Sequence, residues 1–168
     1  MELKGGVGQR HNLERMQKSS QILDVAAGVL IHASRDEIAV FQRKAGGQAG
    51  YLWEFPGGKI ETGETGPQAL QRELQEELGL SLTVGSFLGE SRWMSNHSQA
   101  SSREVRLQVW LVMDFPDSGP KILTAHEAWR WISYRDFNDL AWAPADRPLL
   151  PAIAVFFDKR RQGGSAPL

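Results

Sequence analysis

A glycine pair followed by a glutamate-rich helical segment, in residues 57–80, constrains this chain more than any other stretch. The segment reads GGKIETGETGPQALQRELQEELGL. Pro67 suits the first turn of a helix, where its missing N–H costs nothing. Residues 68–78 are nearly all strong helix formers, and Gly79 suits the position just past the helix end. The segment therefore predicts a turn, then a helix that stops at Gly79.

The predicted helix has an apolar stripe with acidic residues beside it. The stripe repeats a leucine every four residues: Leu70, Leu74 and Leu78. Glu73, Glu76 and Glu77 stand at i, i+3 and i+4, so their side chains are neighbours. Like charges at this spacing repel, and carboxylates near a buried stripe lose water. Oxygen-rich clusters suit hard cations such as Mg²⁺ or Mn²⁺, so we expect a divalent cation that holds a polyphosphate.

A solvated acidic face is the alternative interpretation of the same helix. Arg72 could pair with Glu76 at i+4, and charge runs on helices are commonly solvated. The glycine turn and Glu64, which stand at fixed offsets before the helix, favour the cation site.

The spacing of these residues resembles the complete Nudix box. Gly58 is followed after five residues by Glu64, and after seven more by the run RELQEELGL at 72–80. The flank WEFPGGKIE at 53–61 is similar to the MutT branch, the nucleotide-pool sanitising pyrophosphohydrolases. The box covers about a seventh of the chain, and weaker similarity extends from about Ile22 to about Phe157.

Size and composition fit one globular domain. The chain has 168 residues, 41% of them hydrophobic and 23% charged, which is ordinary for a soluble protein with a core. The formal net charge of −1 argues against a nucleic-acid polymer or a membrane as partner, whereas one metal and a few cations can hold a free nucleotide. The absence of cysteine excludes disulfides, thiolate zinc sites and cysteine nucleophiles. With no long apolar run or signal core, we expect a cytoplasmic protein.

Strand and helix signals alternate along the chain and predict an α/β domain. Strands are expected at 22–31, 37–42, 53–55, 80–89, 105–115 and 128–132. Beside the box helix, we expect a short helix at 134–140 and an amphipathic helix at 149–161, with loops at 44–50 and 94–102 and a turn at 117–120. The resemblance implies a Nudix α/β/α sandwich around a mixed β-sheet, in residues 21–161. Residues 1–20 are expected to be a mobile tail and 162–168 a frayed end.

The resemblance also implies roles for the box residues. Hydrolysis of a phosphoanhydride needs neutralised phosphate charge and an oriented water. The implied metal ligands are Glu73, Glu76 and Glu77 with the Gly57 carbonyl. Glu73 is the favoured base, with Glu64 as an alternative, and Arg72 is expected to anchor a carboxylate by bidentate pairing.

Glu127 is the expected source of a further metal-binding or water-activating carboxylate. It lies in a predicted loop just ahead of a strand, where Nudix proteins often carry such a glutamate. An exposed loop acid is the alternative. His97 and His126 lack ligand-type spacing, so both are expected at the surface.

The remaining candidates concern the nucleotide. Arg43 and Lys44 end the second strand, where MutT-like proteins place a nucleotide-contacting cation, and an ordinary strand-end charge is the alternative. Lys59 could contact phosphate or be solvated. Phe55 or Trp93 could stack on a base or belong to the core.

Asp146 follows a Pro-Ala pair at the position that reads the base in MutT-like proteins. An ionised aspartate only accepts hydrogen bonds, either from the cytosine amino group or from guanine N–H groups. The alternative is a helix N-cap before Leu149. The oxidised-guanine enzyme has asparagine here, so this position departs from its pattern.

The resemblance implies Mg²⁺-dependent hydrolysis of a nucleoside triphosphate to the monophosphate and pyrophosphate, of the 8-oxo-dGTP diphosphatase type. Because of Asp146, a CTP or modified-dCTP pyrophosphohydrolase is the alternative. A dinucleotide or nucleoside-diphosphate-sugar hydrolase is disfavoured by the MutT-type flank. A non-catalytic nucleotide-binding domain is disfavoured because all four box glutamates are present. The sequence leaves monomer and homodimer open.

Overall fold

Strand β1 (Leu23–Ile31) lies inside the sheet because both of its faces are apolar. The computed structural model describes residues 22–46, 50–96 and 102–163. In these residues β1 pairs in parallel with β6 and antiparallel with β2 and β4. The other strands are β2 (Glu37–Arg43), β3 (Trp53–Glu54), β4 (Gly57–Lys59), β5 (Thr83–Asn96), β6 (Ser102–Met113) and β7 (His126–Ser133). The seven-stranded sheet is therefore mixed, with the order β3-β2-β1-β6-β5, β4 beside β1 and β7 beside β2.

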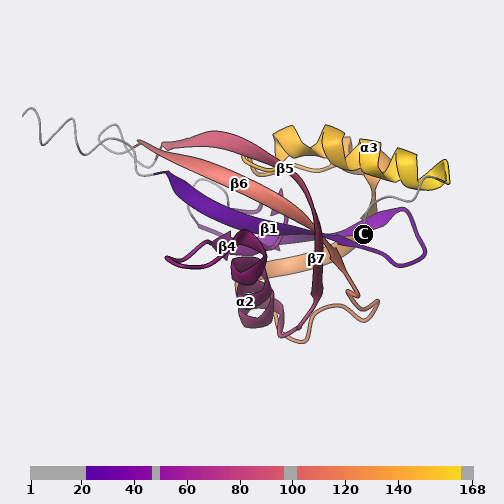
Figure 1. The fold of residues 1–168 in the computed structure, drawn as a ribbon, viewed down its shortest axis with the longest axis horizontal. Helices are drawn as coiled ribbons and strands as arrows, with labels where there is room; N and C mark the ends of the chain where they lie inside the picture. Colours follow the sequence, from indigo (N-terminus) through magenta and orange to yellow (C-terminus); the bar gives the residue numbers. More distant parts are fainter. Residues whose placement is uncertain (1–21, 47–49, 97–101, 164–168) are drawn as a thin grey trace, which may run out of the picture.

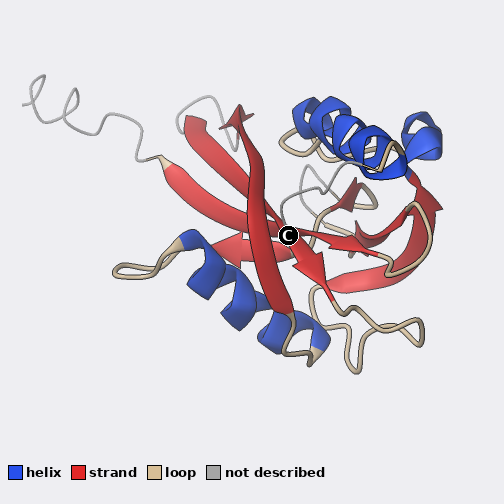
Figure 2. Ribbon diagram, turned by 45° about the vertical axis from the view of Figure 1, so that its right-hand side comes forward, coloured by secondary structure: helices blue, strands red, loops and turns tan. Residues whose placement is uncertain are grey.

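Helices α2 (Gly66–Leu78) and α3 (Leu150–Arg161) cover opposite faces of this sheet (Figures 1 and 2). Alternate residues of β1 divide between the two cores: Val29 packs on the side of α3, and Leu30 on the side of α2. The leucine stripe of α2 is fully buried. The predicted α/β/α sandwich with a mixed sheet is thus confirmed. No helix in the described part of the chain is long and apolar enough to cross a membrane.

Several predicted boundaries need correction. The expected loop at 94–102 is wrong at both ends, because β5 continues to Asn96 and β6 begins at Ser102, so that the polar residues pair across a hairpin. Residues 97–101, with His97, lie outside the described residues, as do 1–21 and 164–168. The short helix is a 3₁₀ helix, η1 (Tyr134–Asp139), and a second one, η2 (Arg147–Leu149), precedes α3.

Candidate active site

Helix α2 is fixed at both ends by local sequence. Thr65 caps its N-terminus and forms a capping box with Gln68, which satisfies backbone N–H groups that the first turn leaves free. Gly79 ends the helix in the left-handed conformation, at φ 68°, which favours glycine. The helix therefore presents its acidic face in a fixed register.

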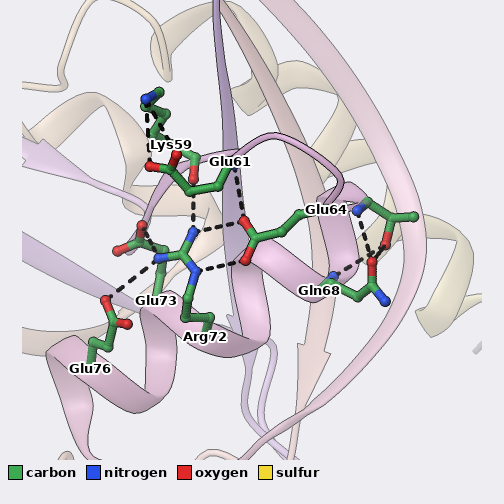
Figure 3. Close-up of polar contacts among 8 residues, drawn as sticks. Lys59, Glu61, Glu64, Gln68, Arg72, Glu73 and Glu76 are labelled. Carbon is green, nitrogen blue, oxygen red and sulfur yellow. Dashed lines mark hydrogen bonds and ion pairs between the residues drawn. The ribbon is translucent and has the colours of Figure 1, made fainter.

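Arg72 is the centre of the acidic face (Figure 3). Its guanidinium binds both carboxylate oxygens of Glu64, at 2.8 and 2.9 Å. It also donates to Glu73 Oε1 at 2.7 Å and to the Lys59 carbonyl at 2.9 Å. The expected bidentate pairing is present, whereas the distance to Glu76 Oε2 is 3.5 Å. The Arg72 hydrogen bond, followed by one from the Glu61 backbone, lowers the pKa of Glu64 to about 2, which makes it a poor proton acceptor at neutral pH.

The glycine pair of the box forms strand β4, and the expected Gly57-Gly58 turn is wrong. Gly57 has φ 148° and lies so close to β1 that a Cβ atom would overlap the Ala26 carbonyl. A Cβ atom on Gly58 would overlap the Glu73 carboxylate instead. The two glycines therefore let β4 fit between β1 and α2, with the backbone against the acidic face.

The three glutamates of the predicted metal site have different surroundings. The side chain of Glu76 is 60% exposed and that of Glu73 is 16% exposed. Burial, opposed by His126 and reinforced by Glu73 and Glu54, raises the pKa of Glu77 to about 7. Its Oε2 atom is buried and has no hydrogen-bond partner among the described residues.

These observations fit a divalent cation held by α2. An orphaned carboxylate oxygen beside a second carboxylate is a costly arrangement that a bound cation would relieve. Among the described residues, however, no three acidic or histidine side chains already converge as a metal site. Two causes are visible: Arg72 draws Glu73 toward itself, and like charges repel. We expect the ligands to close around the ion only when it binds.

A cavity of about 320 Å³ opens on the α3 side of the sheet. Apolar residues of β1 and β6 form its floor, among them Ala27 and Leu107. Phe55 and Trp93, the predicted stacking residues, both line it. Its polar residues include Arg43, Glu54, Ser95 and Asp146, and its lining also includes Gly57 of β4. The cavity therefore reaches the strand that adjoins the acidic face.

Asp146 lies in the cavity wall and is 4% exposed. Its Oδ1 atom accepts the backbone N–H of Phe55 at 2.9 Å. It occupies the N-cap position of η2, as the alternative interpretation expected, but its side chain makes no capping hydrogen bond. Burial, followed by the nearby Glu54 charge, raises the pKa of Asp146 well above its usual value.

The structure separates the three predicted nucleotide-binding cations. Arg43 lines the cavity, and its Nη1 atom donates to Glu54 Oε2 at 2.8 Å. Lys44 instead donates to the Thr124 carbonyl at 2.5 Å. Lys59 is exposed and faces Glu61 at 3.5 Å. Only Arg43 of these three belongs to the cavity lining.

Glu127 lies in strand β7 rather than in the expected loop. The β2–β7 register pairs Gln42 with Ala128 and Arg43 with His126, so Glu127 is the extra residue of a β-bulge. Glu127 is exposed, and among the described residues it belongs to no group of three acidic or histidine side chains that could hold a metal ion. Its role in metal binding or water activation stays a prediction.

His126, next to the exposed Glu127, is buried, so its expected place at the surface is wrong. It is 2% exposed, and its Nε2 atom lies 3.0 Å from Glu54 Oε1. Sequence reasoning missed both His126 and Glu54 as site residues. The only signal for Glu54 is its place inside the WEFPGG flank, and nothing in the sequence marks a bulge at Glu127.

Comparison with known proteins agrees with this geometry. The family model described as NUDIX domain matches residues 22–153. The CTP pyrophosphohydrolase of Escherichia coli is 38% identical over 134 residues, which cover 79% of this chain and 92% of that protein. The 8-oxo-dGTP diphosphatase of the same organism is 32% identical over 131 residues, 78% of this chain and 95% of that protein. The solution structure of the E. coli ORF135 protein superposes with a TM-score of 0.65 at 32% identity, covering 96% of this chain and 100% of that one.

Proposed function

The chain belongs to the NUDIX domain family, and from this premise we propose that it hydrolyses a nucleoside triphosphate to the monophosphate and pyrophosphate with Mg²⁺ or Mn²⁺. The observation that carries the proposal is the acidic face of α2, which adjoins strand β4 at the edge of a nucleotide-sized cavity. The cytoplasmic location stays a prediction.

The cation would be held by Glu73, Glu76 and Glu77 with the Gly57 carbonyl. When bound, it supplies neutralising charge for the polyphosphate and a lower pKa for a coordinated water. Glu73 is the base that we favour, because Arg72 engages its Oε1 atom and leaves the other oxygen for water. Glu64 has both oxygens occupied by the same arginine, so it serves to hold Arg72.

A cytosine nucleotide is the substrate that we propose, ahead of the oxidised guanine nucleotide expected from the box and its flank. The E. coli relative named for CTP is 38% identical to this chain over 134 residues, and the E. coli relative named for 8-oxo-dGTP is 32% identical over 131 residues. Asp146 provides a chemical reason for the same preference. Its raised pKa favours the uncharged acid, which donates one hydrogen bond and still accepts others.

An uncharged carboxyl group matches the pairing edge of cytosine. That edge presents an acceptor, N3, beside a donor, the amino group. The pairing edge of guanine presents the acceptor O6 and two neighbouring N–H donors, and an ionised carboxylate would match the two donors better. In this account, Oδ1 of Asp146 keeps its hydrogen bond to the Phe55 N–H, and the second oxygen carries the proton toward the base.

The pH dependence of kcat/KM tests this assignment. An acid is protonated below its pKa, so activity on CTP that needs the protonated form falls as the pH rises through the raised pKa of Asp146. Asp146→Asn keeps a donor and an acceptor at every pH, so we expect it to retain most CTP activity and to lack this decline. Asp146→Ala should lower kcat/KM by about 10–100-fold. If kcat/KM for CTP declined equally at alkaline pH in the wild type and in Asp146→Asn, the proposed role of the Asp146 proton would be refuted.

The reaction itself is tested by a pyrophosphate-release screen in Mg²⁺. The substrates are CTP, 8-oxo-dGTP, 5-modified dCTP, the four canonical deoxynucleotides and diphosphate-linked compounds. We expect release from CTP to exceed release from 8-oxo-dGTP. Release from none of these compounds would favour a binding domain over an enzyme.

A further inference from the structure

A buried histidine at the start of β7 is linked to the cavity by hydrogen bonds. His126 packs against the Phe41 ring with a centroid distance of 5.3 Å. Its Nε2 atom lies 3.0 Å from Glu54 Oε1, and Glu54 Oε2 accepts from Arg43 Nη1 at 2.8 Å. Arg43 and Glu54 both line the cavity, and His126 lies behind them.

The burial of Glu54 makes both of its hydrogen bonds necessary. Its side chain is 14% exposed, whereas that of Arg43 is 49% exposed. A carboxylate with so little water depends on protein donors. His126 supplies one of the two hydrogen bonds of Glu54, from the protein interior. Without it, Arg43 would be the remaining side-chain partner of Glu54 and would be drawn inward, away from the cavity.

The ring nitrogens of His126 differ from those of His32, the other histidine that is buried among the described residues. In His32, Nε2 bonds Asp117 and Nδ1 accepts two backbone N–H groups, from Ser34 and Arg35. In His126, Nδ1 is buried and has no partner among the described residues. Buried nitrogen atoms without a partner are uncommon, and an apolar side chain would pack on Phe41 without this penalty. Packing alone therefore does not explain a histidine at this position.

We propose that His126 is a positioning residue for nucleotide binding, which fixes the Glu54 carboxylate and, through Glu54, holds the Arg43 guanidinium at the cavity. It acts on the nucleotide through these two residues. The bulge at Glu127 is what turns this histidine inward. The inference rests on the proposed function, because it supposes that a nucleotide fills the cavity. It predicts an effect on KM rather than on kcat.

Three variants test the role of the histidine nitrogen. His126→Leu keeps the bulk of the ring and removes both nitrogens, and we expect it to raise the KM for CTP about tenfold with kcat within about twofold. His126→Gln restores an N–H donor near the Nε2 position and should return KM to within about threefold of the wild type. His32→Leu is the matched control, since it removes a buried carboxylate-paired histidine away from the cavity. It should lower Tm and leave KM unchanged.

A double-mutant cycle with Glu54→Gln tests the chain of hydrogen bonds. Because His126 acts through Glu54, the double variant should raise KM no further than about twofold beyond the larger single effect. Multiplicative effects of the two changes would overturn the proposal. So would a His126→Leu variant that folds and keeps the wild-type KM, or one in which kcat alone falls.

Calorimetric titration with CMP separates failure of this inference from failure of the proposed function. If the wild type binds CMP but hydrolyses no triphosphate, the enzymatic proposal fails, and about tenfold weaker CMP binding by His126→Leu still supports the positioning role. If the wild type hydrolyses CTP and the His126→Leu variant matches it in both assays, only the positioning role fails. A wild type that neither binds nor hydrolyses cytidine nucleotides overturns both.

Discussion

At the scale of single residues, Glu77 carries a charge that its surroundings match poorly. Its pKa is raised to about 7 from an ordinary value of 4.5, chiefly by burial. A carboxyl group with a raised pKa stabilises the fold fully below the unfolded value and loses that contribution as pH rises through the folded value. The metal-free protein should therefore lose stability from this group between about pH 4.5 and pH 7.

The variant Glu77→Gln tests this, because it removes the charge and keeps the shape. In the absence of metal at pH 8, we expect it to raise the unfolding free energy by about 1 kcal/mol, or Tm by roughly 2–4 °C. At pH 4.5 the difference should shrink. Mg²⁺ should raise the Tm of the wild type and not that of the variant. Thermal melts with Mg²⁺ and with EDTA measure both effects, and a less stable variant at pH 8 would contradict the argument.

Single residues also show where sequence reasoning succeeds. The neighbourhood of Glu73, Glu76 and Glu77 could be predicted because helix geometry fixes it locally. The pairing of His126 with Glu54 could not, because it joins residues 72 positions apart and depends on a bulge. The role of Arg72 was predictable in kind, and the structure adds its main partner, Glu64.

At the scale of elements, the site depends on β4 fitting between β1 and α2. Gly57 faces backbone of β1, and Gly58 faces the end of a flexible side chain, Glu73. The two glycines are adjacent and alike in the sequence, yet a methyl group on each would meet a different kind of obstacle. The backbone cannot retreat, whereas the carboxylate can.

Alanine substitutions at these glycines should therefore separate folding from catalysis. Gly57→Ala meets the Ala26 carbonyl at an unfavourable φ of 148°, so we expect it to cost about 2–4 kcal/mol of unfolding free energy. Gly58→Ala should change Tm little and lower kcat by about 10–100-fold, because it displaces Glu73. Chemical denaturation and CTP kinetics on both variants provide the comparison. Equal losses of stability would show that the obstacle at Gly58 is not flexible.

The elements that sequence reasoning predicted well are those with local signals. Helix α2 carries a proline start and a glycine stop, and its expected end at Gly79 is confirmed. The prediction from sequence ends both strands of the β5–β6 hairpin too early, because most of the outer residues are polar and are ordered by pairing across the strands, such as Ser95 with Arg103. The hydrophobic period and the composition of one segment do not show which residues of another strand will pair with it.

At the scale of the whole molecule, the sheet divides the site into two parts. The leucines of α2 pack on one face, and the cavity residues Ala27, Phe55 and Leu107 belong to the core on the other. Strand β1 pairs with β4 through Val25–Ala27 and with β2 only through Leu30 and Ile31. Strands β2 and β4 both pair with β1, but at different ends of it, so they diverge from each other. The acidic face and the cavity meet at β4.

This division predicts positive coupling between cation and nucleotide. In the proposed function each ligand would be held by a different layer, and the phosphates of a bound nucleotide would add ligands to the cation. We expect Mg²⁺ to tighten the binding of CMP by about 5–150-fold, and CMP to tighten Mg²⁺ by the same factor. Titrations of each ligand in the presence and absence of the other measure it. Independent affinities would mean that the two parts do not share a ligand.

Glu127 is the extra residue of the bulge in β7, so the alternation of inward-facing and outward-facing side chains along this strand shifts by one residue there. After the bulge, Trp129 and Trp131 turn toward Phe115, and before it an imidazole turns inward. A relative whose strand is one residue shorter would bring a different neighbour to that inner position, even if every other residue were kept. The length of this strand, as much as the identity of its residues, then decides which side chain lies behind the cavity. A sequence alignment that places a gap at the wrong position in this strand would not show that the buried side chain differs.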